Sequence, residues 1–253
     1  MNGDLEPSTR VSSLEIWHAA SSSSQPGKLE RTCEDWMDAE DRQRADQFLK
    51  PTSRNQHVVG RGMARRLLSG ESIDPRSIQF AIENHGKPYV VKPDAAKRPF
   101  NVAHTDGLVL CGIGNDSHRS VGVDVERLDR RTDPELAERY FSQPEIDYLR
   151  QCQAESERRE TFLKIWTLKE SFIKAIGTGL QTPLADFAFR AIDTATPVIE
   201  LLNPDLDRGE RWQFFSFRPR PGFIAAIAVA PSVRDASITF RLHPFDELIK
   251  AQR

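Results

Sequence analysis

Residues 120–126 read Ser-Val-Gly-Val-Asp-Val-Glu, a strand pattern that carries both a fold signal and a chemical one. Because side chains alternate along a β-strand, the three valines face one side and Asp124 and Glu126 face the other, roughly 6 to 7 Å apart. Two carboxylates that point the same way suit a hard cation such as Mg²⁺, which proteins hold with one or two carboxylates plus substrate phosphates. An edge strand with a solvated acidic face explains this segment equally well.

A second stretch, residues 162–177, reads FLKIWTLKESFIKAIG and has helical spacing. Its apolar residues recur on one face, and Glu170 and Lys174 are i, i+4 neighbours at the edge of that face. One acid and one base therefore share a side of the helix. Taken alone, the pair is read as an ordinary surface ion pair.

Two shorter segments carry candidate contacts to an anion. The turn Gly86-Lys87-Pro88 restricts the backbone on both sides of Lys87, which suits a fixed phosphate contact. His104 ends an expected strand immediately before Thr105-Asp106-Gly107, where Asp-Gly between apolar runs is a strong hairpin signal. A single turn lysine is usually solvated and a single strand-end histidine is usually structural, so neither residue is decisive by itself.

The remaining pattern predicts an α+β fold with two similar lobes. Helices are expected over 34–50, 53–69, 134–152 and 156–176, and strands over 14–20, 78–83, 89–91, 100–104, 108–113, 120–126, 187–192, 197–202, 212–218, 223–229 and 237–242. The order of strand, helices and strands occurs twice, which favours an N-terminal lobe at 14–117 and a C-terminal lobe at 118–253. Residues 1–13 are small, polar and unpatterned, and they predict a disordered tail.

Composition excludes several classes of protein. The 253 residues include 35 basic and 37 acidic side chains, and a net charge of -2 gives no general attraction to nucleic acids or anionic membranes. The longest apolar run, residues 223–230, is far shorter than the roughly 20 residues that span a bilayer. The N-terminus lacks a basic segment followed by an apolar core, so a cytoplasmic protein is expected. The three cysteines are far apart in sequence, which argues against disulfides and structural zinc.

Taken together, these segments resemble the 4'-phosphopantetheinyl transferase superfamily, in the long, two-lobed, surfactin-synthetase-activating form that serves nonribosomal peptide and polyketide synthases. The resemblance lies in the order and spacing of four blocks: Gly86-Lys87-Pro88, Phe100-Asn101-Val102-Ala103-His104-Thr105, Gly122-Val123-Asp124-Val125-Glu126, and residues 166–180 (WTLKESFIKAIGTGL). The last block is the most specific. The helical region before these blocks and the strands after them agree with the family only in pattern.

The resemblance implies Mg²⁺-dependent transfer of 4'-phosphopantetheine from coenzyme A to a serine hydroxyl of an apo carrier protein, with release of adenosine 3',5'-bisphosphate. The carrier would belong to a peptide, polyketide or fatty-acid synthase. In such an enzyme Asp124, Glu126 and Glu170 match the Mg²⁺ ligands, and Glu170 also matches the base that takes the serine proton. Lys174 matches the group that neutralises the leaving phosphate. Two lobes related by pseudo-two-fold symmetry would form the active site at their interface, so a monomer is expected to suffice.

The resemblance also implies contacts between the protein and the phosphates of coenzyme A. Lys87 and His104 match such contacts, and Arg44 and Arg61, on two arginine-rich helices, are assigned to the same task. Arg61 is equally well explained as a solvated helix residue. Ala103 stands where many relatives have serine, so a hydroxyl contact to the nucleotide is expected to be missing.

Two other functions stay open at this point. Another Mg²⁺-dependent phosphoryl or nucleotidyl transferase could use the same three carboxylates, but the sequence has no Gly-x-x-x-x-Gly-Lys-Ser/Thr phosphate loop. A non-catalytic module could bind carrier proteins or nucleic acid through the arginine-rich stretch 42–66. That reading would leave the three carboxylates without a purpose.

Overall fold

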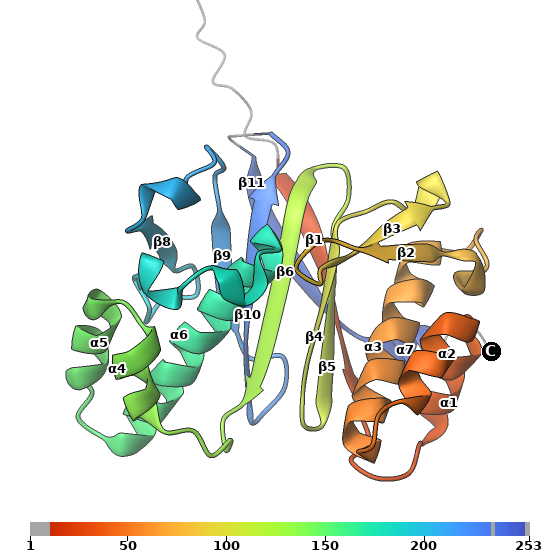
Figure 1. The fold of residues 1–253 in the computed structure, drawn as a ribbon, viewed down its shortest axis with the longest axis horizontal. Coiled ribbons are helices and arrows are strands. Elements are labelled where there is room, and N and C mark those ends of the chain that lie inside the picture. Colours follow the sequence, from red (N-terminus) through yellow and green to blue (C-terminus); the bar gives the residue numbers. More distant parts are fainter. Residues whose placement is uncertain (1–10, 234–235, 251–253) are drawn as a thin grey trace, which may run out of the picture.

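Two β-sheets pack against each other at the centre of the molecule, and helices cover their outer sides (Figure 1). The structure is a computed structural model that describes residues 11–233 and 236–250. The first sheet has the order β11 (Ser237–Pro244), β1 (Val11–Ala20), β5 (Leu108–Ile113) and β4 (Phe100–Thr105); the second has the order β6 (His118–Arg127), β10 (Phe223–Pro231) and β9 (Gln213–Phe217). The valines of residues 120–126 lie in the apolar layer between the sheets, as the alternation predicts.

The chain runs through the same series of elements twice. The first series is β1, α1 (Lys28–Asp35), α2 (Ala39–Asp46), α3 (Pro51–Ser69), the hairpin β2 (Gln79–Ile82) and β3 (Pro88–Lys92), β4 and β5. The second is β6, α4 (Ala137–Tyr140), α5 (Gln143–Arg150), α6 (Glu155–Ile176), the hairpin β7 (Phe187–Arg190) and β8 (Val198–Leu201), β9 and β10. In both sheets the first strand of the series pairs with the last, and the last pairs with the one before it, always antiparallel.

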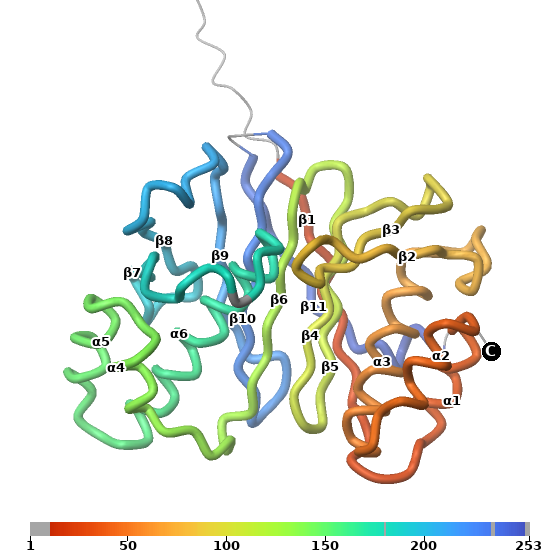
Figure 2. Tube along the Cα trace, in the orientation of Figure 1, coloured from red at the N-terminus to blue at the C-terminus, as the bar shows by residue number. Residues whose placement is uncertain are grey.

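The final segment of the chain stands outside this double series. Strand β11 pairs in parallel with β1, and α7 (Phe245–Lys250) follows it directly. The ring of Phe245 packs edge-on against Trp17 and Trp36, with ring centroids 6.3 and 6.0 Å apart. The C-terminal end therefore lies with the N-terminal elements, as the tube in Figure 2 also shows. The sequence pattern predicts β11 but neither its partner nor α7.

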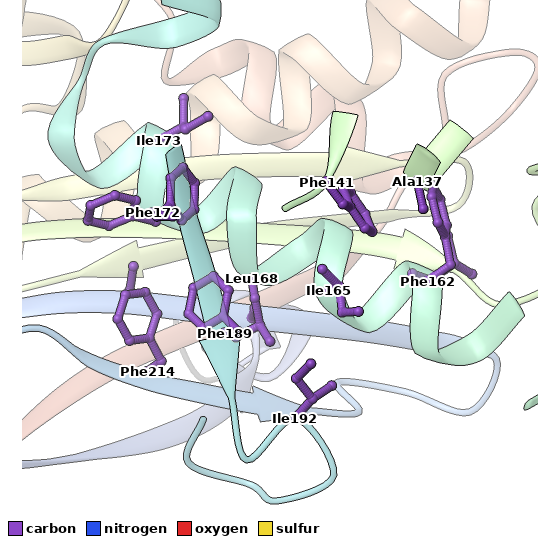
Figure 3. Packing of buried hydrophobic residues seen from close by; sticks show 14 of the residues in the cluster. Ala137, Phe141, Phe162, Ile165, Leu168, Phe172, Ile173, Phe189, Ile192 and Phe214 are labelled. Atoms are coloured by element: carbon purple, nitrogen blue, oxygen red, sulfur yellow. The ribbon is translucent and has the colours of Figure 1, made fainter. Parts of the chain in front are cut away.

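Each sheet carries one long helix on its outer face. Helix α6 lays the predicted apolar stripe against the second sheet and the β7–β8 hairpin; Figure 3 shows Ile165, Leu168 and Phe172 pointing toward Phe189 and Phe214. The helix ends at Gly177, whose positive φ of 73° suits a residue without a side chain. Helix α3 covers the first sheet in the same way. No helix within the two described ranges is long and apolar enough to cross a membrane.

Two helix predictions are wrong because polar residues start new helices inside the expected ranges. The range 34–50 divides into the end of α1 and a separate α2, since the side chain of Asp38 accepts a hydrogen bond from Asp41 N and caps α2. The range 134–152 breaks at Ser142, which caps α5, and Pro144 follows in its first turn. Residues 11–13 of the predicted tail belong to β1, and residues 1–10 lie outside the described residues.

Short 3₁₀ turns complete the fold. They lie at Pro75–Ser77, Asp94–Ala96, Pro134–Leu136, Gly179–Gln181, Leu184–Asp186 and Pro204–Leu206. They connect the longer elements without adding a layer.

The backbone of α6 approaches the backbone of β6 at Gly122. A Cβ atom at this position would lie 2.5 Å from Ala175 N and 2.9 Å from Ala175 Cα, and closer still to Ser171 O. Because all of these atoms are backbone, a side chain here requires the helix to move. Gly122 thus fixes how α6 lies on β6.

We predict that Gly122→Ala lowers the free energy of unfolding by about 3 kcal/mol, because overpacking against backbone cannot be relieved by a side-chain rotation. Gly60→Ala is the matched control: its Cβ would meet mainly a side-chain methyl, Val102 Cγ1 at 2.8 Å, and alanine is the better helix former. Urea denaturation of both variants measures the effect. Equal stability of Gly122→Ala and wild type would contradict the close contact.

Candidate functional site

An ion pair joins the two most informative segments of the sequence. Lys174 Nζ, on α6, lies 2.6 Å from Asp124 Oδ1, on β6. Asp124 is only 6% exposed, and burial raises the pKa of its carboxyl group while the charge of Lys174 opposes that rise. The other oxygen, Asp124 Oδ2, is buried and has no hydrogen-bond partner among the described residues.

Glu126 and Glu170 share the electrostatic field of Asp124. Burial and the charge of Asp124 raise the pKa of Glu126 to about 7, although Arg130 lowers it. Glu126 Oε1 pairs with the guanidinium of Arg130, and Oε2 accepts a hydrogen bond from Thr105 Oγ1 at 3.3 Å. Burial, followed by the charge of Asp124, also raises the pKa of Glu170. Asp124 is therefore close enough to each of the two glutamates to repel its negative charge.

These residues suit a hard divalent cation whose coordination shell is completed by substrate oxygens. No group of three or more His, Cys, Asp or Glu side chains within the described ranges forms a ready metal cage. Mg²⁺, however, is commonly held by one or two carboxylates together with substrate phosphates and water. The unpartnered Asp124 Oδ2 is an oxygen ligand of the right kind in the right place. A cation there would also offset the repulsion between Asp124 and each of the two glutamates.

Strand β4 brings the Phe100–Thr105 motif beside the carboxylates. Asn101 Oδ1 accepts a hydrogen bond from Val123 N at 2.9 Å, so β4 holds the edge of β6 next to Asp124. His104 follows at the end of β4 and keeps part of its surface exposed. Partial burial of the ring, and then the charge of Lys174, lower its pKa. His104 is thus within electrostatic reach of the Lys174–Asp124 pair.

Lys87 occupies the turn between β2 and β3, as predicted, but its ammonium group has partners within the protein. Lys87 Nζ donates to Ala175 O at 2.6 Å and to Ser120 Oγ at 3.2 Å. Burial lowers the pKa of Lys87 to about 8. The lysine thereby ties the β2–β3 turn to the C-terminal end of α6, where carbonyl oxygens attract a cation.

The two arginines assigned from the first half are placed differently from each other. Arg61 lies against Asp41, with Nε 2.9 Å from Oδ1, and its guanidinium covers the ring of Phe80 at 4.6 Å. It is not a solvated helix residue. Arg44 is exposed at the end of α2. Burial is the main cause that lowers the pKa of Arg61, and the charges of Arg65 and Arg44 add to it.

His57 is a candidate that the sequence analysis missed. Burial, and then the charge of Arg61, lower its pKa to about 4, and its Nε2 is buried without a hydrogen-bond partner in the described part of the chain. Its position within the apolar face of a regular helix gives no signal in the sequence, because a single histidine there is usually part of a core.

Three adjoining cavities run along these residues and share lining residues, and we refer to them together as the groove. One, of about 300 Å³, is lined by His57, Arg61 and His104; a second, also of about 300 Å³, by Lys87, Glu170 and Lys174. These two share Gly86, Pro88 and Val102. A third, of about 510 Å³, continues past His104 to Glu126 and Arg130. The groove is lined by cations from both halves of the chain, by Glu126 of β6 and by Glu170 of α6. Cationic side chains of this kind can form charge-assisted hydrogen bonds with phosphate groups.

Comparison with known proteins agrees with this arrangement. Residues 120–228 match the family model described as "4'-phosphopantetheinyl transferase superfamily". The chain is 31% identical to the 4'-phosphopantetheinyl transferase HetI of Nostoc sp. over 190 residues. This alignment covers 74% of this chain and 76% of HetI. It is 30% identical over 166 residues to a 4'-phosphopantetheinyl transferase of Bacillus subtilis, covering 65% and 71%.

Solved structures of holo-[acyl-carrier-protein] synthases give weaker matches. The enzyme of Thermotoga maritima aligns with a TM-score of 0.35 at 26% identity, over 44% of this chain and 62% of that one. The enzyme of Bacillus anthracis, solved in complex with CoA, aligns with a TM-score of 0.38 at 20% identity, over 46% and 99%. The family assignment rests on the sequence relatives.

The chain belongs to the 4'-phosphopantetheinyl transferase superfamily, whose enzymes move the phosphopantetheine arm of coenzyme A onto carrier proteins. The predicted family is therefore confirmed. Neither a different class of phosphoryl transferase nor a purely binding module agrees with these relatives.

The pKa of Glu126 predicts how stability depends on pH in metal-free buffer. Because folding raises this pKa from an ordinary 4.5 to about 7, the folded state holds the proton more tightly, and its contribution to stability is lost as the pH rises from 4.5 to 7. Glu126→Gln removes this loss. Unfolding free energies from urea titrations should shift in favour of the variant by up to about 3 kcal/mol between pH 4 and pH 8. A constant difference across this range would contradict the raised pKa.

Proposed function

We propose that this chain transfers 4'-phosphopantetheine with Mg²⁺ held by Asp124, Glu126 and Glu170. The observation that carries the proposal is the Lys174–Asp124 ion pair, which joins the strand and the helix that supply all of these groups. The unpartnered Asp124 Oδ2 and the raised pKa values of the two glutamates support a cation in their midst. When bound, Mg²⁺ would stabilise the charge that develops on the pyrophosphate of coenzyme A.

The residues of α6 divide the remaining chemistry between them. Glu170, with its raised pKa, is proposed to accept the proton of the carrier's serine hydroxyl as the oxygen attacks the phosphorus. Lys174 is proposed to neutralise the phosphate that leaves with adenosine 3',5'-bisphosphate. One helical turn separates the two residues, so they can act on the attacking and leaving sides of one in-line displacement.

The cationic middle part of the groove is proposed to bind the nucleotide part of coenzyme A. His104 and Arg61 line the same cavity, and Arg44 lies close enough to add positive charge. Lys87 lines the neighbouring cavity and would contact a phosphate by exchanging its hydrogen bond to Ser120 or Ala175. Ala103 offers no hydroxyl for the contact that many relatives make.

The architecture supports two lobes, 14–117 and 118–253, related by a pseudo-two-fold axis with the active site between them. The repeated series ends at residue 113 and starts again at residue 118, and its strands pair in the same order in both sheets. Strand β11 and α7 qualify this division, because residues 237–250 lie with the first lobe. Since one chain supplies both sides of the groove, we further propose that the protein is a monomer. From its nearly balanced charge we also propose that it is cytoplasmic and binds neither nucleic acid nor membranes.

The acceptors are proposed to be apo carrier proteins of peptide, polyketide or fatty-acid synthases. The test is incubation of the purified protein with coenzyme A, Mg²⁺ and a panel of apo carriers, followed by mass spectrometry of each carrier. We expect a phosphopantetheine adduct on the carrier serine, and its loss when EDTA is added. Transfer at an unchanged rate in EDTA would remove Mg²⁺ from the proposal.

Glu170→Gln should lower kcat by about 10² to 10⁴-fold at saturating coenzyme A and Mg²⁺, because the amide cannot accept the serine proton. Excess Mg²⁺ separates the two proposed roles of Glu170: a lost ligand is compensated by more metal, whereas a lost base is not. A variant with near-normal kcat and an unchanged acidic limb of the pH profile would assign the proton to another acceptor.

His104→Ala should raise the KM for coenzyme A about tenfold or more and change kcat little. A contact to a non-reacting phosphate stabilises ground and transition states equally, and a charge-assisted hydrogen bond contributes about 1.5 to 3 kcal/mol. Lys87→Ala should behave similarly, whereas Lys92→Ala, an exposed lysine at the end of β3, is the control. If both test variants keep the wild-type preference for coenzyme A over dephospho-coenzyme A, neither His104 nor Lys87 contacts the 3'-phosphate.

A further inference from the structure

We propose that Arg130 is a resident counter-ion of Glu126 that competes with the divalent metal and is displaced when the metal binds. The inference rests on the proposed metal site and adds a residue that controls its affinity. Arg130 lies four residues beyond Glu126 in the loop after β6, and its guanidinium pairs directly with Glu126 Oε1. It acts through Glu126 and is therefore a positioning residue.

In the metal-free protein, some carboxylate oxygens of Asp124 and Glu126 have a cationic partner and others do not. Lys174 takes Asp124 Oδ1 and Arg130 takes Glu126 Oε1, while Asp124 Oδ2 has no partner within the described residues. A metal that binds Asp124 Oδ2 can leave Lys174 in place. A metal that also binds Glu126 must share its carboxylate with Arg130 or drive the guanidinium away.

The surroundings of Arg130 allow it to leave. The Arg130 side chain is 46% exposed, whereas that of Glu126 is 11% exposed, so the arginine can turn into solvent at little cost while the carboxylate stays fixed. Thr105 Oγ1 holds the other oxygen of Glu126 in position during this exchange. Arg130 also lines the 510 Å³ end of the groove, which gives the released guanidinium a place close to the site.

Arg127, the last residue of β6, provides a matched comparison three residues before Arg130. It lines the same cavity and carries the same charge, but it pairs with Asp129, which is not among the proposed ligands. If the effect of Arg130 depends on its direct pairing with Glu126, Arg127 should not reproduce it.

The test measures the Kd for Mn²⁺ by electron paramagnetic resonance of the free ion, with coenzyme A at one saturating concentration and no carrier protein, because the substrate phosphates are expected to complete the site. A protein-free titration with the same coenzyme A corrects for Mn²⁺ bound to coenzyme A alone. We expect Arg130→Gln to bind Mn²⁺ about three- to tenfold more tightly than wild type, and Arg127→Gln to stay within about twofold. In a Glu126→Gln background, Arg130→Gln should give no further gain. Circular dichroism confirms that each variant is folded.

Several results would overturn the inference: equal or weaker Mn²⁺ binding by Arg130→Gln, equal tightening by both arginine variants, or no measurable binding by wild type and Arg130→Gln alike. Asp124→Asn separates this inference from the proposed metal site. If Asp124→Asn loses Mn²⁺ while Arg130→Gln matches wild type, the competition fails and the metal site stands. If Asp124→Asn binds like wild type, the metal site itself fails.

Discussion

The contact between the backbones of α6 and β6 at Gly122 sets the geometry on which the site depends. The glycine meets Ser171 and Ala175, which directly follow Glu170 and Lys174 along α6. Two residues further along β6 comes Asp124, which faces Lys174 across the same contact. Any side chain at position 122 would push the helix outward and separate the groups that the proposed reaction needs close together. The packing of a helix on a strand is thus what brings an acid, a base and the paired carboxylates to one place.

Burial gives the site its electrostatic character. Asp124 and Glu126 lie at a strand that is almost fully enclosed, so their charges are costly in the metal-free protein, and the chain offsets them with its own cations, Lys174 and Arg130. Cations and carboxylates therefore line the same cavities at both ends of the groove, Glu126 with Arg130 and Glu170 with Lys174. Such a site favours a ligand that brings both a divalent cation and phosphate groups, because each then satisfies charges that the protein alone only partly balances. Coenzyme A with Mg²⁺ is a ligand of this kind.

The sequence predicted most of the strands and the two long helices because their patterns are local. The alternation at 120–126 and the apolar stripe at 162–177 each determine which face of an element is buried, and the structure agrees with both. It did not predict the parallel pairing of β11 with β1, because strand partners depend on contacts between residues more than two hundred positions apart. The predicted helices 34–50 and 134–152, which precede α3 and α6, are each divided in the structure for a different reason. Capping by Asp38 and Ser142 breaks a helix without interrupting its apolar period.

The site was predicted less evenly than the fold. Family motifs predicted site residues on β6, α6 and β4, and the structure places these residues near one another. A motif, however, gives no information about which partners a side chain already has. Hence neither the hydrogen bonds of Lys87 nor the ion pair of Arg130 was foreseen. His57 was missed because it lies within an otherwise regular helix. A crystal structure with coenzyme A and Mn²⁺, phased to locate the metal by anomalous scattering, tests the central claim most directly. We predict one Mn²⁺ bound by Asp124, Glu126, Glu170 and the pyrophosphate; a metal bound elsewhere, with Asp124 still paired only to Lys174, would contradict this account.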